Sequence, residues 1–242
     1  MDRRLEIAVL VPCLNEAAGI ASVVESFRQA LPDARVYVYD NASTDDTFAV
    51  AERAGAIARR EPARGKGNVV RRMFADVEAD VYVLVDGDGT YDAPSAPRMI
   101  DLLGAQQLDM VCGKRIDSEQ AAYRQGHRLG NRVLTGLVAN LFGDSVTDIL
   151  SGYRVMSRRF VKSFPALSKG FEIETELTVH ALDLRVPIAE IATPYGVRAQ
   201  GTVSKLNTWR DGWRILKAIG RLVKEERPLA FFFTGGAVLA LL

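Results

Sequence analysis

The chain has 242 residues, 48% hydrophobic and 25% charged, a balance that suits one large globular domain, alone or with an appendage, and excludes a largely disordered protein. Lys and Arg number 31 against 30 for Asp and Glu, so the net charge of +1 gives no whole-protein case for nucleic-acid binding, and we expect no nucleic-acid partner. No secretory signal is visible before the first apolar run, so we expect the bulk of the protein in the cytoplasm.

Short apolar runs rich in β-branched residues alternate with longer segments of helical period along the first half of the chain. The predicted strands span residues 5–11, 36–39, 81–85 and 110–112. The predicted helices span residues 16–30, 43–54 and 69–77, with Ser43 or Thr44 as the candidate N-cap of the second. This order predicts an α/β fold with a mostly parallel sheet and helices on both faces.

The second half continues with a predicted helix at about residues 123–143, an irregular stretch at 148–154, a helix near 171–184 and a strand at 187–191. An amphipathic helix then runs from Lys205 to Pro228. Its basic face carries seven cations against three acids. Its apolar positions, at three- and four-residue spacing, are Leu206, Trp209, Trp213, Leu216, Ile219 and Val223.

The last fourteen residues, 229–242, carry no charge. As a helix they would reach roughly 21 Å, which is short of the roughly 30 Å hydrocarbon core of a bilayer. We favour a transmembrane helix cut short, because the preceding helix is basic and carries tryptophans, as juxtamembrane segments do. The alternative is a terminal helix packed against protein, including the interface of a homo-oligomer. We therefore divide the chain into a catalytic domain (1–204), a juxtamembrane helix (205–228) and a hydrophobic segment (229–242).

Cys13 and Cys112 each stand in an apolar run without a second cysteine or a histidine at metal spacing. This favours buried, reduced thiols over metal ligands. His127 and His180 match no ligand pattern either, and we expect His180 to serve packing or to lie on the surface. The candidate site therefore has to come from other residues.

Three polar loops follow predicted strands, at residues 12–16, 40–46 and 86–92. Ligands of parallel sheets bind beyond the carboxyl ends of the strands, so these loops should converge on one site. Asp86 and Asp88 flank Gly87, and both carboxylates could bind Mg²⁺ or Mn²⁺ together with substrate phosphates. Taken alone, a polar turn in which an aspartate caps a helix explains the pattern about as well.

Seven short motifs in one order provide the context. They are VPCLNE (11–16), YDNASTDDT (39–47), RGKGN (64–68), VDGDGTYD (85–92), GKR (113–115), DILSGYR (148–154) and RAQGTVSKL (198–206). Together they resemble inverting family-2 glycosyltransferases of the Rossmann-like GT-A fold. Within that family the chain is most similar to dolichyl-phosphate mannose synthases and bacterial polyprenyl-phosphate glycosyltransferases, over nearly all of residues 7–206.

The resemblance implies a role for each matching position. It places Pro12, Leu14, Glu16, Tyr39 and Asn41 around the nucleoside, and Asp86, Gly87 and Asp88 at the metal and the diphosphate. It assigns phosphate contacts to Arg115, Arg198 and Lys205, and the acceptor phosphate to Arg128 and Arg115. Without the motifs, these basic side chains would be read as solvated surface charges. The chain departs from the family at Asn41, where an aspartate is frequent, at Thr90, where glutamine is common, and in the spacing of Arg198 and Lys205, which is one residue longer.

Asp148 matches the position suspected as the catalytic base, and we predict Asp148 and Asp88 as catalytic residues. A phosphate monoester has a second pKa of about 6 and is largely ionised near neutral pH, so it does not strictly require a base. An electrostatic or positioning role for Asp148 therefore stays open, as does that of a buried structural carboxylate.

The implied activity is metal-dependent transfer of a hexose from a nucleotide-diphosphate sugar to a polyprenyl phosphate, dolichyl or undecaprenyl. The implied location is the cytoplasmic face of the membrane, with anchoring through the C-terminus. Two alternatives remain: a family-2 transferase acting on a glycan or soluble acceptor, and a catalytically silent nucleotide-binding module or membrane scaffold.

Overall fold

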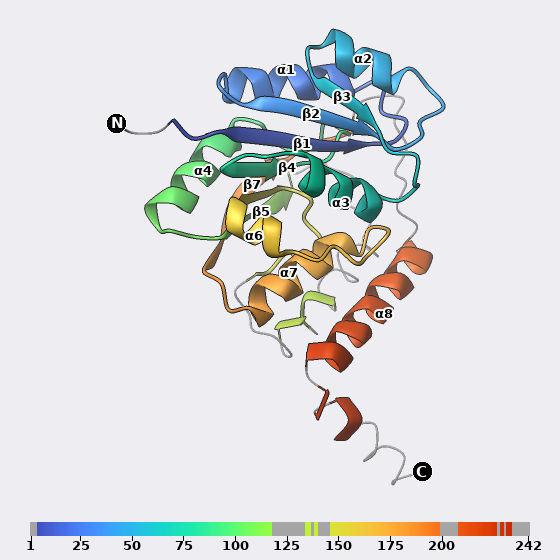
Figure 1. Cartoon of the computed structure of the whole chain (residues 1–242), viewed down its shortest axis with the longest axis vertical. Coiled ribbons are helices and arrows are strands. Elements are labelled where there is room, and N and C mark those ends of the chain that lie inside the picture. Colours follow the sequence, from blue (N-terminus) through green and yellow to red (C-terminus); the bar gives the residue numbers. More distant parts are fainter. Residues whose placement is uncertain are drawn as a thin grey trace.

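A computed structural model describes residues 4–117, 134–136, 138–139, 146–198, 208–226, 228–229 and 231–233. Seven strands form one sheet in the order β3-β2-β1-β4-β6-β5-β7. Figure 1 shows β1 between β2 and β4. The strands are β1 (Ile7–Cys13), β2 (Arg35–Asp40), β3 (Ile57–Arg60), β4 (Val81–Leu84), β5 (Met110–Asp117), β6 (Arg154–Ser157) and β7 (Ile188–Tyr195). The helices are α1 (Ile20–Ala30), α2 (Thr47–Arg53), α3 (Lys66–Asp76), α4 (Ser95–Ala105), α6 (Arg158–Ser163), α7 (Ile173–Asp183) and α8 (Thr208–Glu226).

The sheet is parallel except at β6, which pairs antiparallel with both β4 and β5. In the centre, Leu10 of β1 lies in register with Tyr37 of β2 on one side and Leu84 of β4 on the other. All four strands predicted in the first half exist, and so does the strand predicted at 187–191. The predicted α/β fold with a mostly parallel sheet is therefore confirmed.

Helices cover both faces of the sheet, as expected for buried parallel strands. Successive residues of β1 point to opposite faces, so Val9 and Val11 pack with α1, α2 and α4, whereas Ala8 and Leu10 pack with α3, α6 and α7. The predicted apolar face of α1 is buried. This two-sided burial holds the carboxyl ends of the strands in place.

The boundaries differ from the predictions at the N-terminal ends of α1 and α2. Helix α1 begins at Ile20 rather than at residue 16, and α2 begins at Thr47 after Asp46 as N-cap residue. The predicted caps Ser43 and Thr44 are wrong, because their polar groups bond to Asn15 of the neighbouring loop instead.

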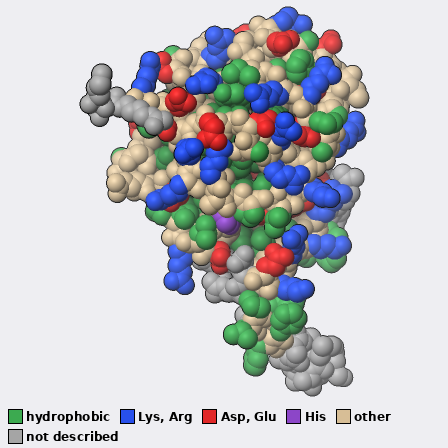
Figure 2. Space-filling view, viewed as in Figure 1, with side chains coloured by type: hydrophobic (Ala, Val, Ile, Leu, Met, Phe, Trp, Pro, Cys, Tyr) green, Lys and Arg blue, Asp and Glu red, His purple; other side chains and the backbone are tan. Residues whose placement is uncertain are grey.

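The C-terminal helix α8 packs on the domain through Ile215, Ile219 and Val223, which join a buried cluster with α7 residues. The predicted apolar stripe is therefore divided, because Ile219 and Val223 are buried whereas Trp213 is 59% exposed and Leu216 is 41% exposed; the buried Ile215 was not among the predicted positions. Figure 2 shows hydrophobic side chains gathered on the narrow lower end of the molecule, where α8 and the short segment after it lie.

Within the described part of the chain, no helix combines the length and apolar character needed to cross a membrane. Residues 230 and 234–242 of the predicted terminal segment lie outside the described residues. The same holds for most of the helix predicted at 123–143, of which residues 134–136 and 138–139 are described and helical.

Candidate active site

The first two polar loops are tied together at the carboxyl edge of the sheet. The Asn15 amide donates to the Ser43 hydroxyl at 2.8 Å, and the Thr44 amide donates to the Asn15 side chain at 2.7 Å. The Glu16 amide donates to the Thr47 hydroxyl at 2.8 Å, which fixes the start of α2 against the loop after β1. These bonds hold the two loops in one rigid arrangement, as the topology predicts.

The third loop carries the aspartate pair directly after β4, and glycines make room for it. A Cβ on Gly87 would lie 2.3 Å from the sulfur of Cys13, so the turn between Asp86 and Asp88 requires glycine. A Cβ on Gly152, from the loop before β6, would lie 2.7 Å from Oδ2 of Asp86. Asp86 and Asp88 therefore lie where the end of β1, the loop after β4 and the loop before β6 are in close contact.

Both aspartates already have cationic partners within the protein. Asp86 forms an ion pair with Lys66, the first residue of α3. Asp88 accepts from Arg198 at 2.7 Å through one oxygen and from the Thr90 hydroxyl at 2.6 Å through the other. The family resemblance assigned both Arg198 and Asp88 to the phosphates of the donor, and the structure brings the two side chains together.

Lys66 is shared between Asp86 and Glu174, which lies in the first turn of α7. Burial disfavours the charged form of Lys66, but the two carboxylates outweigh it and raise its pKa. Burial also raises the pKa of Glu174, against the opposing effect of Lys66. Oε2 of Glu174 is buried and has no hydrogen-bond partner among the described residues. The aspartate pair is thus part of a larger cluster of buried charges.

The predicted base Asp148 lies against Arg115 of β5. Both of its oxygens accept from the guanidinium, each at 2.7 Å, and both side chains are largely buried. The guanidinium carbon of Arg115 also lies 5.5 Å from the ring centroid of Tyr195. A bidentate arrangement of this kind holds an arginine in one orientation. The geometry therefore suits Asp148 as the residue that orients Arg115.

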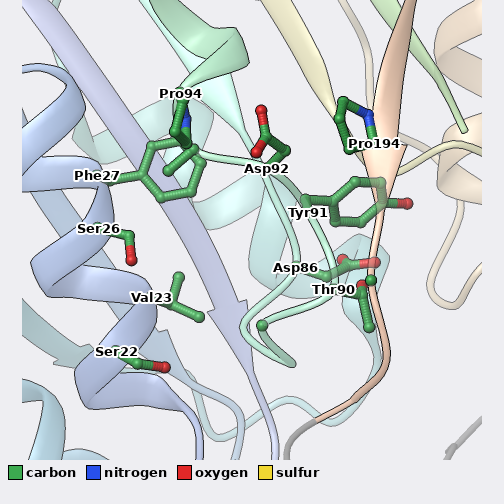
Figure 3. A pocket seen from close by; sticks show the side chains of 13 residues that line it. Ser22, Val23, Ser26, Phe27, Asp86, Thr90, Tyr91, Asp92, Pro94 and Pro194 are labelled. Carbon is green, nitrogen blue, oxygen red and sulfur yellow. The ribbon is translucent and has the colours of Figure 1, made fainter. Parts of the chain in front are cut away.

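Aromatic residues connect these elements. The Gly152 amide donates to the Tyr91 hydroxyl at 2.8 Å, and the Tyr91 ring lies 5.5 Å from that of Tyr153 and 5.2 Å from that of Tyr195. Next to them is an open cavity of about 300 Å³ between α1 and the loop after β4, shown in Figure 3. Asp86 and Thr90, from the loop after β4, line one side, and Ser22 and Ser26 of α1 line the opposite side (Figure 3).

The residues predicted around the nucleoside come from neighbouring segments, because Pro12 of β1 pairs in register with Tyr39 of β2 and the Asn41 backbone amide donates to the carbonyl of Cys13 at 2.8 Å. Pro12 is buried within β1, Leu14 is half-buried in the following loop, and Glu16 is buried beside the start of α2. Tyr39 differs, because its hydroxyl donates to Asp76 at 3.1 Å. Asp76 is the last residue of α3, and Lys66, which contacts Asp86, is the first. Because a helix rises 1.5 Å per residue, the two ends lie roughly 15 Å apart. The Tyr39 hydroxyl is therefore directed away from the aspartate pair.

Asn41 has a local structural role that explains its departure from the family pattern. Its side-chain nitrogen donates to the carbonyls of Glu61 and Ala63 at 2.9 and 2.8 Å, and its oxygen accepts from the Gly65 amide at 2.7 Å. A carboxylate could not donate to the two carbonyls. Asn41 thus fastens the loop that leads into α3 and Lys66.

Arg128 and Lys205, predicted at the acceptor phosphate and the diphosphate, lie outside the described residues. Sequence reasoning missed Lys66, Glu174 and Gly152 as members of the site. Lys66 and Gly152 stand inside the motifs RGKGN and DILSGYR, which gave a signal without a role. Glu174 gave none, because a glutamate in a first helical turn is ordinary.

The donor set of the site fits a divalent metal of the predicted kind. Mg²⁺ and Mn²⁺ are bound by oxygen ligands, Mg²⁺ typically by one or two carboxylates together with substrate phosphates. Asp86, which is partly exposed and borders the cavity, and Asp88 can supply such oxygens. The described residues hold no group of three or more His, Cys, Asp or Glu side chains suited to a metal. Phosphate oxygens of a donor and water molecules could complete the coordination.

Comparison with known proteins gives three further findings. The model of the family described as glycosyl transferase family 2 matches residues 8–164. Glycosyltransferase AglJ of Haloferax volcanii is 36% identical over 95% of this chain and 76% of its own length. Dolichyl-phosphate hexose transferase of the same organism is 28% identical over 92% of this chain and 96% of its own length.

Among solved structures, the chain is similar to glucosyl-3-phosphoglycerate synthase from Mycobacterium tuberculosis in complex with Mn²⁺, uridine diphosphate and glucosyl-3-phosphoglycerate. The TM-score is 0.72, the sequence identity is 26%, and the match covers 91% of this chain and 79% of the other. The likeness extends over nearly the whole α/β domain, which agrees with the fold that the motifs imply.

Proposed function

We propose that this chain, which belongs to glycosyl transferase family 2, transfers a hexose from a nucleotide-diphosphate sugar to a polyprenyl phosphate. Membership of the family makes the chain a glycosyltransferase, with a nucleotide sugar as the donor class. The lipid acceptor, the metal dependence and the residue roles are our proposal. Its central support is the convergence of Asp86, Asp88, Lys66 and Arg198 at the carboxyl end of β4.

This cluster contains carboxylates that can bind a metal and a cation, Arg198, that can bind the phosphates of the leaving group. The donor's diphosphate would lie beside Arg198, which can exchange its bond to Asp88 for charge-assisted hydrogen bonds to phosphate oxygens. A divalent metal held by Asp86 and Asp88 would supply further stabilisation of the negative charge that develops on the departing nucleotide. An oxygen of the acceptor phosphate forms the new bond to the anomeric carbon as the bond to the diphosphate breaks.

In this scheme Asp148 positions Arg115 and need not remove a proton. The acceptor phosphate is largely ionised near neutral pH, since its second pKa is about 6. Arg115, fixed by both oxygens of Asp148, can present its guanidinium to a phosphate in one orientation. The role of Asp148 is then to keep that orientation, and a loss of its charge would act through Arg115.

The lipid acceptor is supported by the relative named dolichyl-phosphate hexose transferase and by the outer face of α8. That face exposes Trp213 and Leu216, together with the basic residues Arg214, Lys217, Arg221 and Lys224. Aromatic and basic side chains on one helix face are typical of segments that lie against an anionic bilayer surface. We propose that α8 rests on the cytoplasmic face of the membrane, with the hydrophobic segment 229–242 as anchor.

A soluble phosphorylated acceptor is the second candidate. The structural neighbour is named as a synthase of glucosyl-3-phosphoglycerate, so its product carries the phosphate of a small molecule. The phosphate-recognising chemistry around Arg115 would serve either acceptor. The two candidates differ only in what carries the phosphate.

An acceptor comparison tests the proposal. The protein is incubated with a panel of radiolabelled nucleotide sugars and Mn²⁺, with either undecaprenyl phosphate in detergent or 3-phosphoglycerate in buffer. We expect label to pass into the organic phase with one donor and the lipid phosphate. Label that appears only on 3-phosphoglycerate would favour the second candidate, and transfer to neither acceptor would contradict the proposal.

A further inference from the structure

We propose that Lys66 is a tethered cation that competes with the divalent metal for Asp86, and that Glu174 moderates this competition by sharing the ammonium group. The inference rests on the proposed metal site of Asp86 and Asp88. It concerns two residues to which neither the resemblance nor the motifs assigned a role. Its consequence is that the site holds metal weakly until the donor's diphosphate arrives.

The geometry places Lys66 where it blocks one metal ligand. Its ammonium contacts Oδ1 of Asp86 and Oε1 of Glu174, and its side chain is only 9% exposed. Lys66 is the one hydrogen-bond partner of Asp86 among the described residues. A metal that binds Oδ1 of Asp86 must therefore displace the ammonium, and one that binds Oδ2 must tolerate the ammonium next to it.

The structure also provides a place for the displaced ammonium. The Lys66 side chain, at the start of α3, is only 9% exposed and is held between Asp86 and Glu174. Oε2 of Glu174 is buried without a hydrogen-bond partner among the described residues, although a buried polar atom normally has one. A small shift of the ammonium from Asp86 onto both oxygens of Glu174 would satisfy that atom and free Asp86. Glu174 is thus the second acceptor that makes the exchange feasible.

The charges of the cluster favour coupling between metal binding and donor binding. Asp86, Asp88 and Glu174 carry three negative charges, and Lys66 and Arg198 carry two positive charges, so a divalent ion alone would leave the cluster with a net charge of +1. The diphosphate of a donor would reverse that excess. Metal and donor should therefore bind with positive cooperativity, each raising the affinity for the other.

Three variants separate this competition from a general electrostatic background. Lys66→Met removes the competing cation and should tighten Mn²⁺ binding by about tenfold or more. The reason is that a unit positive charge a few ångström from the metal, in a partly buried site, repels the metal strongly. Glu174→Gln leaves the ammonium wholly with Asp86 and should weaken Mn²⁺ binding. The double variant Lys66→Met/Glu174→Gln leaves the net charge unchanged, and we expect it still to bind Mn²⁺ more tightly than the wild type.

Lys162→Met is the matched control. Lys162 also pairs with a carboxylate, Glu78 at 2.8 Å, and donates to backbone carbonyls at the far end of α3. Its replacement removes one positive charge without touching the site. We expect its Mn²⁺ affinity to match that of the wild type.

The measurement is isothermal titration of the full chain with MnCl₂, with and without uridine diphosphate, after thermal unfolding has established which variants are folded. Tighter binding by Lys66→Met and by the double variant supports the inference. Unchanged or weaker binding by the double variant overturns it, and that variant decides the question if Lys66→Met does not fold. If the wild type binds no Mn²⁺ in either condition, the proposed metal site itself has failed, which is a different result.

Discussion

Gly152→Ala tests how closely the position of Asp86 controls the reaction. The new Cβ would lie 2.7 Å from Oδ2 of Asp86, where ordinary van der Waals contacts begin at 3.4 Å. The carboxylate must therefore retreat by the difference between 2.7 and 3.4 Å, about 0.7 Å. Gly152 is not among the residues with positive φ, so alanine is compatible with the backbone. Since a 1 Å misplacement can cost about 100-fold, we expect kcat/KM to fall by about 10- to 100-fold, or about 1.4–2.8 kcal/mol.

The assay is initial-rate transfer from the preferred labelled donor, combined with thermal unfolding. Gly104→Ala in α4 is the control, because a Cβ there would meet nothing within 4 Å. We expect the control to keep full activity and to gain about 0.5–1 kcal/mol of stability, as glycine-to-alanine changes in helices do. Activity of Gly152→Ala within twofold of the wild type, at unchanged metal dependence, would refute the reasoning.

Three further predictions follow from contacts of single side chains. Gly87→Ala should abolish most activity, because its Cβ would lie 2.3 Å from the sulfur of Cys13, and the double variant with Cys13→Ala should recover part of it; no recovery would contradict this steric account. Tyr39→Phe should cost about 0.5–1.5 kcal/mol of stability, measured by urea unfolding, through the lost bond to Asp76, and should leave donor affinity unchanged, because that bond occupies the hydroxyl; a weaker donor Kd would show that the hydroxyl itself contacts the donor. Burial lowers the pKa of His180, so the unfolded state takes up a proton first as the pH falls below about 6.5, and stability should drop from pH 7.5 to 5.5. His180→Leu should show a smaller drop in the same urea titrations, whereas an identical drop would assign it to other groups.

The fold could be predicted where the hydrophobic pattern is long and local. The four apolar positions of α1 are all buried, and the strands at 36–39 and 81–85 exist within one or two residues. Strands β3 and β6 were missed because both contain arginine and lack a continuous apolar run, whereas β4, which also has four residues, is wholly apolar. In β6, Arg154 is fully buried and donates hydrogen bonds to the carbonyls of Ser151 and Ile149. The hydrophobic pattern of the sequence does not predict a buried arginine of this kind.

The outer face of α8 shows a different limit. Helical periodicity identified an apolar stripe but could not tell which residues pack on the domain. Ile215, Ile219 and Val223 do so because α7 offers a buried cluster to them, and Trp213 and Leu216 are left outside. Which face of an amphipathic helix is covered depends on the tertiary neighbour and not on the period alone.

The site could be predicted where the parallel sheet brings the loops after its strands to one edge. The strand ends correctly brought residues 12–16 and 40–46 together, and the motifs correctly pointed to the neighbourhood of Asp88 and Arg198. The pairing of Lys66 with Glu174 joins residues separated by 108 positions, so it depends on how α3 and α7 pack on one face of the sheet. Contacts of that range can be found only in the folded chain.

The most direct test of the proposed activity compares the wild type with Asp88→Asn in the lipid-acceptor assay. This substitution keeps the size of the side chain and an oxygen for Thr90, but it removes the charge that pairs with Arg198 and that we assign to the metal. The measured quantity is labelled sugar extracted into the organic phase per minute, at matched protein folding. We predict that the wild type forms the lipid-linked sugar and that Asp88→Asn loses at least about 100-fold of that rate, the order expected for removal of one electrostatic contact to the transition state. Comparable rates for the two proteins would contradict the account.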